Sequence, residues 1–284
     1  MLKFSSYGPV DTDLHYYVPR KKLIDFACSQ LSGENPEKEG HYLTVWAPRQ
    51  TGKTWVMNHV LYKLSEDTRF DVVKLELEVL KTETDVKEVL TYIEEQLAQE
   101  LNKKNITKAD TPKRFQNIFS KENLKKPLIL ILDEFDALEE EAISAIVGVF
   151  RNIYNSRRGE GDKKTGEKKY LLHSVALIGV RTVLGIENKK GSPFNVQRSV
   201  HIPDLTFPEV ESMFKWHERE SDQSFGSEVI KRLFYETKGQ PGMTSWFGEL
   251  LTEGSHLFDV EKDQHINEPV DLVGFFQIFQ NVNF

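Results

Sequence analysis

The sequence has 284 residues and a net charge of -7, with 39% hydrophobic and 29% charged residues. This composition fits one large domain, or a core domain with a smaller companion. It argues against a disordered chain and against a protein that coats nucleic acid through overall basic charge, although a local basic patch stays open. Cys28 is the single cysteine, which excludes an intramolecular disulfide and a cysteine metal cage. We expect its thiol to be buried and inert.

The N-terminus, residues 1–13, lacks the apolar run of a signal peptide. The longest uninterrupted apolar run, Leu128 to Leu132, is far shorter than the ~20 residues that span a bilayer. We therefore expect a soluble cytoplasmic protein without a membrane partner.

The stretch from residue 42 to residue 60, YLTVWAPRQTGKTWVMNHV, predicts a strand, a loop and a helix in that order. YLTVWA is typical of a buried strand, and apolar residues after Thr54 recur on one helical face. Between them, Ala47-x-x-x-x-Gly52-Lys53-Thr54 nearly matches the phosphate-binding loop G-x-x-x-x-G-K-[ST], with alanine in place of the first glycine.

This loop has the residues that a nucleotide phosphate requires. Backbone N–H groups at a helix N-terminus supply donors and a favourable dipole. Lys53, expected as an exposed loop residue, would reach the terminal phosphates, and the Thr54 hydroxyl would complete a magnesium shell. The N–H groups come from Arg49, Gln50, Thr51, Gly52, Lys53 and Thr54. The alternative is an ordinary glycine turn before a helix.

A second motif follows a strand predicted at residues 71–77 and helices predicted from Asp85 and from Thr111. Pro127 introduces an apolar strand that ends in Asp133 and Glu134, and ligands bind at the carboxyl ends of strands in open α/β sheets. Asp133 would hold magnesium through water, and Glu134 would orient or deprotonate an attacking water. The alternative is that this acidic pair starts a helix. Finding the phosphate-loop motif and the acidic strand end in this order makes the alternative less favoured.

A helix is predicted over residues 139–154, followed by the Gly- and Lys-rich stretch SRRGEGDKKTGEKK. We expect this stretch to be a mobile, solvated surface loop. Arg157 and Arg158 could instead meet a phosphate or a neighbouring subunit.

SVALIGVR and SVHIPDL predict two further strands. The strands lack alternation and are separated by helices, which indicates a parallel sheet covered on both faces. Arg181, at the end of SVALIGVR, suits charge that develops on a transferred phosphate. The alternative is a surface arginine after a strand.

Past His201, helices are predicted near residues 207–220, 227–238 and 241–252, so we expect a small helical domain. The predicted domains are residues 1–203 and 204–284. The apolar stretch FFQIFQNVNF at the end suggests the start of a further region in a longer protein.

Taken together, these motifs resemble those of P-loop ATPases of the AAA+ superfamily, on the branch shared by STAND signalling ATPases and origin-recognition-type proteins. The loop PRQTGKT is similar to that of the AAA-like ATPases of bacteria and archaea. The likeness covers about residues 7–252. The motifs are Tyr17–Leu23, which resembles a segment that packs the base and ribose, the two Walker motifs at Ala47–Thr54 and Leu128–Glu134, the γ-phosphate-sensing strand at Val175–Arg181, and the G-x-P element of a helical lid at Lys238–Pro241.

The resemblance implies an α/β fold: an αβα sandwich with a five-stranded parallel P-loop NTPase sheet, followed by a small helical lid. It implies ATP and Mg²⁺ as cofactors, with Glu134, Lys53 and Arg181 as catalytic residues and Thr54 and Asp133 at the metal. N–H groups of the lid helix that starts at Pro241 would face the nucleotide. Nucleotide contacts are expected from Tyr17, Val18, Arg20, residues 49–54 and Pro241.

We therefore predict a magnesium-dependent ATPase, slow or partner-stimulated, that acts as a nucleotide-driven conformational or assembly switch. Its expected partner is a second copy of the chain or an effector protein. One alternative is a DNA-acting loader or transposition-regulator-like ATPase, for which nucleic acid would be the partner. Another is a nucleotide-binding regulatory module with negligible turnover. A kinase is less favoured, because the Asp133-Glu134 pair suits water activation.

Overall fold

The computed structural model describes residues 2–8, 10–103, 109–179, 197–253 and 265–266. The chain forms two compact units. The sheet unit comprises Lys21–Pro48 and Val56–Ile202, and the lid unit comprises Met1–Arg20, Arg49–Trp55 and Pro203–Phe284. This grouping differs from the sequence-based division at residues 203 and 204, because the N-terminal segment and most of the phosphate loop pack with the helices after Pro203.

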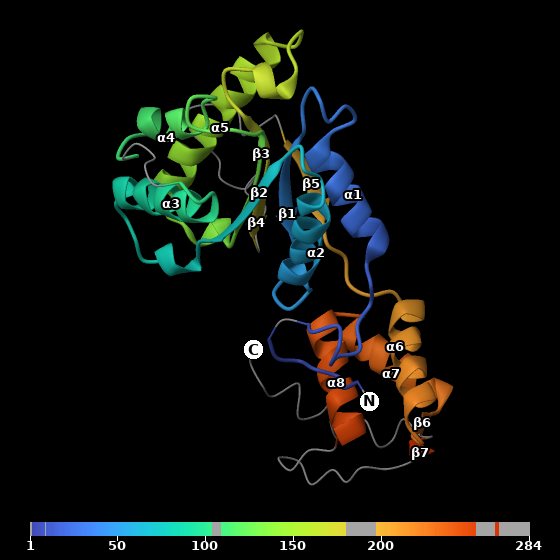
Figure 1. Cartoon of the computed structure of the whole chain (residues 1–284). Helices are drawn as coiled ribbons and strands as arrows, with labels where there is room; N and C mark the ends of the chain where they lie inside the picture. The colour runs from blue at the N-terminus through green and yellow to red at the C-terminus, as the bar shows by residue number, and fades with distance from the viewer. Residues whose placement is uncertain (1, 9, 104–108, 180–196, 254–264, 267–284) are drawn as a thin grey trace. The chain divides into compact units, whose positions relative to one another are not determined.

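The sheet unit contains a five-stranded parallel sheet, as predicted, with strand order β2-β3-β4-β1-β5. Figure 1 shows α1 and α2 on one side of this sheet and α3, α4 and α5 on the other, so the αβα sandwich is also confirmed. The strands are β1 (Tyr42–Trp46), β2 (Asp71–Glu76), β3 (Leu128–Asp133), β4 (Leu172–Gly179) and β5 (Gln197–His201), and the helices are α1 (Lys21–Ser32), α2 (Lys53–Ser65), α3 (Val86–Glu100), α4 (Pro112–Ile118) and α5 (Glu140–Gly159). Three short 3₁₀ helices are η1 (Glu78–Leu80), η2 (Phe135–Ala137) and η3 (Thr165–Glu167).

The central strands are buried over their whole length, which explains why they carry no polar alternation. Every residue of β3 and β4 is buried. Leu128, Leu130 and Leu132 belong to the cluster formed with α3, α4 and α5, and the intervening Ile129 and Ile131 are fully buried as well. Because each such side chain contributes roughly 1.5–3 kcal/mol when it leaves water, the strand requires helices on both faces.

The lid unit contains the three helices predicted after the sheet: α6 (Phe207–Glu220), α7 (Ser227–Thr237) and α8 (Pro241–Glu253), with a short parallel pair of β6 (Ser224–Phe225) and β7 (His265–Ile266). A capping box starts α6, in which the Thr206 N–H donates to Glu209 Oε2 at 2.7 Å. Its core brings residues from the N-terminal segment, Phe4 and Tyr16, against Phe214 and Phe247. The helices therefore hold the start of the chain.

The basic stretch after residue 155 is largely ordered structure, so the prediction of a mobile loop from its first residue is wrong. α5 continues to Gly159, and the Arg157 side chain is buried. Arg157 donates from Nη1 to the Tyr170 carbonyl at 2.5 Å and from Nη2 to Thr165 Oγ1 at 2.7 Å. These internal bonds occupy Arg157, whereas Arg158 is exposed.

His173 lies in the same buried network and is held neutral. A carbonyl oxygen only accepts, so His173 Nε2 donates to the Ser32 carbonyl at 3.0 Å. Its Nδ1 then accepts from the Thr165 hydroxyl at 2.9 Å. Burial lowers the pKa of His173 to about 3, because no water solvates an imidazolium there.

This pKa predicts a loss of stability in acid. The unfolded His173 takes up a proton below its ordinary pKa of about 6.5 and the folded one does not, so the free energy of unfolding falls as pH drops from there toward 3. The slope reaches about 1.4 kcal/mol per pH unit. Urea unfolding between pH 7 and pH 5 should show a flatter slope for His173→Gln than for the wild type. Equal slopes would show that His173 is protonated in the folded state.

Candidate nucleotide-binding site

The loop between β1 and α2 contains two left-handed residues. Gln50 and Gly52 are both left-handed, with φ of 58° and 83°, and α2 begins at the next residue, Lys53. Left-handed residues within a loop at a helix N-terminus turn successive N–H groups toward one concave side, where an anion can bind. Ala47 is fully buried and is not left-handed, so alanine fits the first position without strain.

Lys53 is not the exposed loop residue that we expected. It is the first residue of α2 and is only 7% exposed. Thr54, in the same turn, is half-buried. An ammonium in this environment interacts more strongly with an anion than it would in water, because the local dielectric is lower.

Asp133 ends β3 and is almost fully buried, at 2% exposure. Its Oδ1 accepts from the Glu134 N–H at 3.1 Å. Its Oδ2 lies 3.0 Å from Lys74 Nζ. Both carboxylate oxygens are therefore held by the sheet unit itself.

Glu134 is left-handed, with φ of 52° and ψ of 40°. This conformation costs a residue other than glycine of order 1–3 kcal/mol and concentrates at functional sites. It ends the strand abruptly and starts η2, leaving the Glu134 side chain half-buried beside Asp133. The acidic pair is thus one buried and one more accessible carboxylate.

Lys74 is a site residue that we did not predict. Val73, Leu75 and Leu77 alternate toward the core with α3, α4 and α5, so Lys74 points to the opposite face of β2. The sequence signal for Lys74 was a lysine in the middle of an apolar strand. That this strand, β2, lies beside β3 with its acidic end is known only from the strand order in the structure.

The end of β4 completes the carboxyl edge of the sheet. A Cβ on Gly179 would lie 2.5 Å from Asp136 Oδ1, so only glycine lets Asp136 approach β4 this closely. β4 lies between β1 and β3 in the sheet, and all three strands end at the same edge because they are parallel. Arg181 lies outside the described residues, two positions after Gly179.

The predicted base-binding segment contacts aromatic and acidic residues of the lid unit. The Tyr17 ring lies 5.6 Å from the Trp55 ring and 5.8 Å from the Trp216 ring. Trp55 belongs to the first turn of α2, immediately after Thr54, so this segment is packed beside the start of that helix. Val18 packs against the lid core.

Arg20 is engaged within the lid unit. It is left-handed, with φ of 43°, and its guanidinium donates to the Pro203 carbonyl and lies 3.9 Å from Glu209. Burial lowers the pKa of Arg20, and the carboxylates of Glu209 and Asp204 oppose this shift. Arg20 therefore ties the N-terminal segment to the start of α6.

The turn between α7 and α8 requires its glycine. Lys238 and Gly239 are both left-handed, with φ of 52° and 77°. A Cβ on Gly239 would lie 1.9 Å from the Leu205 carbonyl oxygen, which is far inside contact distance. Pro241 is then the first residue of α8, where its missing N–H and fixed φ suit a helix start.

The start of α8 is hydrogen-bonded to the phosphate loop. Gly242 N–H donates to the Gln50 carbonyl at 3.0 Å. Gln240 Nε2 donates to the Arg49 carbonyl at 3.1 Å, and its Oε1 accepts from Met243 N–H at 2.5 Å. The Gly242 and Met243 N–H groups are therefore bonded within the chain, and our expectation that this helix start faces a nucleotide stays a prediction.

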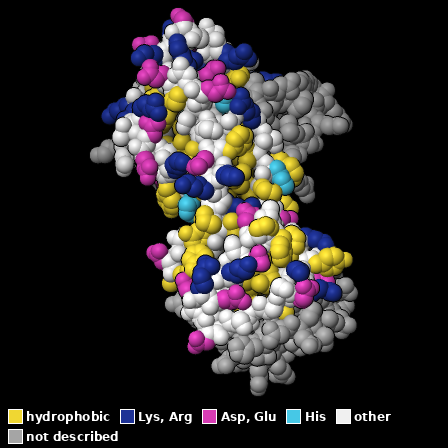
Figure 2. Space-filling view, turned by 90° about the vertical axis from the view of Figure 1, so that its right-hand side faces the viewer, with side chains coloured by type: hydrophobic (Ala, Val, Ile, Leu, Met, Phe, Trp, Pro, Cys, Tyr) yellow, Lys and Arg dark blue, Asp and Glu magenta, His cyan; other side chains and the backbone are white. Residues whose placement is uncertain are grey.

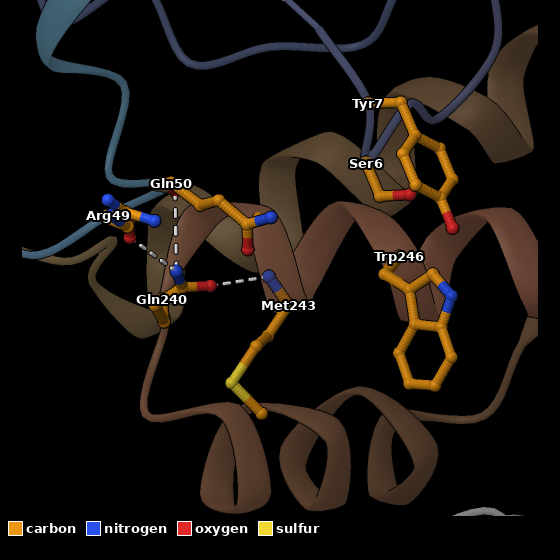
Figure 3. A pocket seen from close by; sticks show the side chains of 8 residues that line it. Ser6, Tyr7, Arg49, Gln50, Gln240, Met243 and Trp246 are labelled. Carbon is orange, nitrogen blue, oxygen red and sulfur yellow. Dashed lines mark hydrogen bonds between the residues drawn. The ribbon is translucent and has the colours of Figure 1, made fainter. Parts of the chain in front are cut away.

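These contacts border a pocket of about 610 Å³ in the lid unit. Figure 3 shows the polar side chains of Arg49, Gln50 and Gln240 on one side and the Tyr7 and Trp246 rings on the other. The volume is typical of small-molecule sites. Trp246 is only partly buried against the lid core and lines this pocket.

Within the described residues, no group of three or more His, Cys, Asp or Glu side chains could form a metal cage. The oxygen donors of Asp133 and Thr54 suit Mg²⁺, which usually binds one or two protein oxygens together with phosphates and water. In the same part of the chain, no helix is long and apolar enough to cross a membrane.

The sequence matches the family described as AAA-like domain over residues 5–247. The fold is similar to the Orc1 protein of Aeropyrum pernix, solved in complex with DNA, with a TM-score of 0.55 and 13% identity over 92% of this chain and 66% of that one. Cdc6p from Pyrobaculum aerophilum gives a TM-score of 0.54 and 14% identity, over 83% of this chain and 62% of that one. Drosophila ORC bound to DNA gives a TM-score of 0.55 and 14% identity, over 83% and 55%.

None of the curated proteins matches the sequence. The chain spans less than two thirds of the length of the solved structures above, and at these identities the likeness shows a shared fold. The match to the family, in contrast, covers most of the chain. The protein therefore belongs to the AAA-like domain family.

Proposed function

We propose that this protein binds ATP with Mg²⁺ and hydrolyses it, and that its nucleotide state switches the lid or the assembly of the protein. The observation that carries the proposal is the phosphate loop: left-handed Gln50 and Gly52 precede a helix that opens with Lys53 and Thr54. It begins directly after β1, in a sheet whose β3 ends at Asp133. Family membership supports a nucleotide-binding ATPase in general.

The phosphates would be held by backbone N–H groups of residues 49–54 and by the Lys53 ammonium. Lys53 is buried, so its interaction with a phosphate would be little screened by solvent. Thr54 and Asp133 would hold Mg²⁺, directly or through water. When bound, Mg²⁺ neutralises phosphate charge.

The hydrolytic role falls to Glu134. Asp133 is buried and held on both oxygens, whereas Glu134 is half-buried, so Glu134 is the carboxylate better suited to orient or deprotonate an attacking water. Arg181 follows β4 and would supply positive charge to the transferred phosphate. Tyr17, Val18 and Arg20 would border the base, with Trp55 as an added aromatic neighbour of Tyr17.

A switch needs a physical link between the nucleotide and the lid. Gly242 N–H and Gln240 Nε2 bond to carbonyl groups of Gln50 and Arg49, which lie in the loop that would hold the phosphates. A change in loop conformation on nucleotide binding would therefore break or tighten contacts at the start of α8. Pro241, between these two residues, fixes the first turn of that helix.

A DNA-acting ATPase is the second candidate, favoured by the fold shared with proteins solved on DNA. The face in Figure 2 carries interspersed acidic and basic side chains, which suits protein partners, a second copy or an effector, better than a phosphate backbone. Salt-dependent binding of duplex DNA would support the second candidate.

The first prediction concerns the link between α8 and the phosphate loop. In Gln240→Ala, the Met243 N–H loses its acceptor, so its amide exchange, followed by NMR, should accelerate about fivefold for a net hydrogen bond of ~1 kcal/mol. Gln240→Glu keeps the acceptor for the Met243 N–H but loses the donor to the loop carbonyl. Amide exchange at Met243 should therefore stay slow in this variant, while exchange at Gly242 should accelerate. Unchanged Met243 exchange in Gln240→Ala would contradict the role of this side chain.

A second prediction concerns Lys53. Lys53→Ala should weaken ATP binding by roughly ten- to hundredfold, because a charge-assisted hydrogen bond contributes about 1.5–3 kcal/mol. Calorimetric titration of ATP measures this loss, with circular dichroism to check folding. Lys63→Ala is the matched control on the same helix: its exposed pair with Asp25 should not affect ATP. An unchanged affinity in Lys53→Ala would refute the phosphate site.

The third prediction separates the acidic pair. Glu134→Gln should keep ATP bound while slowing phosphate release by ~10²–10⁴-fold, the usual cost of losing a general base. The exposed Glu139→Gln serves as control. Undiminished turnover would assign water activation elsewhere. Negligible turnover in the wild type, with ATP bound and candidate partners added, would instead favour a regulatory nucleotide-binding module.

A further inference from the structure

Lys74 forms an ion pair with Asp133, the carboxylate that we expect to hold magnesium. Lys74 Nζ lies 3.0 Å from Asp133 Oδ2 and 3.2 Å from Glu76 Oε1. The Lys74 side chain is only 8% exposed and that of Asp133 only 3%, so this is a buried ion pair and not a surface contact. Glu76, at 71% exposure, is its solvated partner.

Strand pairing fixes this arrangement. Glu76 lies directly opposite Asp133 in the register of β2 and β3, and Lys74 lies opposite Ile131. Residues 74, 76, 131 and 133 therefore share one face of the sheet, and Lys74 is the diagonal neighbour of Asp133. A lysine is long enough to span this diagonal with its ammonium.

Because the pair is buried, the Asp133 carboxylate depends on Lys74 to offset its negative charge. A buried carboxylate needs compensation, because an uncompensated ion in a low dielectric is very unfavourable. Asp133 obtains it from Lys74 on one oxygen and from the Glu134 N–H on the other. The same carboxylate would face a triphosphate in the proposed function, where an uncompensated negative charge would repel the ligand.

We propose that Lys74 is a built-in counter-ion for Asp133, a positioning residue that fixes this carboxylate and offsets its charge before magnesium arrives. The idea rests on the proposed function. Nucleotide binding should then depend less on Mg²⁺ than in a site where the metal alone neutralises the acidic strand end. Lys74 also holds Asp133 in one orientation, so that Glu134 keeps its place beside it.

The test measures the dissociation constant of ATP in EDTA and in excess Mg²⁺. The readout is the EDTA value divided by the Mg²⁺ value. Lys74→Met should raise this ratio about tenfold, since it removes one positive charge that only the metal can then replace. Lys74→Arg keeps the charge and should stay within about twofold of wild type. Lys87→Met, an exposed lysine on α3, is the neutral control. A folded Lys74→Met with the wild-type ratio would overturn the proposal.

A second measurement needs no nucleotide. Mg²⁺ alone should raise the melting temperature of Lys74→Met but leave that of the wild type unchanged, because only the variant has an uncompensated Asp133. If the wild type fails to bind ATP at all, the proposed function fails, and this comparison still decides the role of Lys74. No effect of Mg²⁺ on the variant would then refute it.

Lys74→Met could also fail to fold, because breaking one side of a buried pair strands the other charge. The double variant Lys74→Met/Asp133→Asn removes both charges. Recovery of folding in the double variant supports the counter-ion role. A double variant as unstable as the single one would show that Lys74 matters only for packing, and would overturn the proposal.

Discussion

The complete burial of the central strands restricts where charged side chains can lie in this protein. β3 and β4 are buried along their whole length, so a charged side chain within them would lack solvent on either face of the sheet. Acidic side chains are accommodated where these strands end, and parallel strands all end at one edge. Asp133, Glu134 and Asp136 accumulate there for this reason, and the phosphate loop leaves β1 at the same edge by chain continuity. The apolar core thereby decides where a nucleotide can be bound.

Left-handed residues other than glycine mark several points where the chain leaves regular structure. In the described part of the chain they are Arg20, Gln50, Asn102, Glu134 and Lys238, each at a cost of order 1–3 kcal/mol. Gln50 and Glu134 lie in the phosphate loop and after β3, which the proposed function uses, and Lys238 lies at the turn into α8. Asn102, in contrast, follows the end of α3, so a left-handed residue does not by itself mark a functional segment.

Sequence patterns predicted the elements whose causes are local. The strand, loop and helix around Gly52 follow from neighbouring residues, and so do the capping box at Thr206 and the proline that starts α8. Lys74 and Arg157 could not be assigned in this way, because the partners of each are set by strand register or by packing across distant segments. Gln240 is a similar case: its bonds to the Arg49 and Gln50 carbonyls join segments about 190 residues apart. Burial of Lys53 was missed because it depends on the surrounding packing and not on the loop sequence.

The identity of 13% to Orc1 at a TM-score of 0.55 shows how little of the chain the fold constrains. A shared fold fixes where the strands end, but the residues at those ends determine the reaction. In this chain Asp133 is paired with Lys74, and the start of α8 bonds to carbonyl groups of the phosphate loop. Under the proposed function, a nucleotide would meet a carboxylate whose charge is already offset and a helix start that is already bonded to the loop. Binding would then have to alter these contacts, and this alteration is the step that would move the lid.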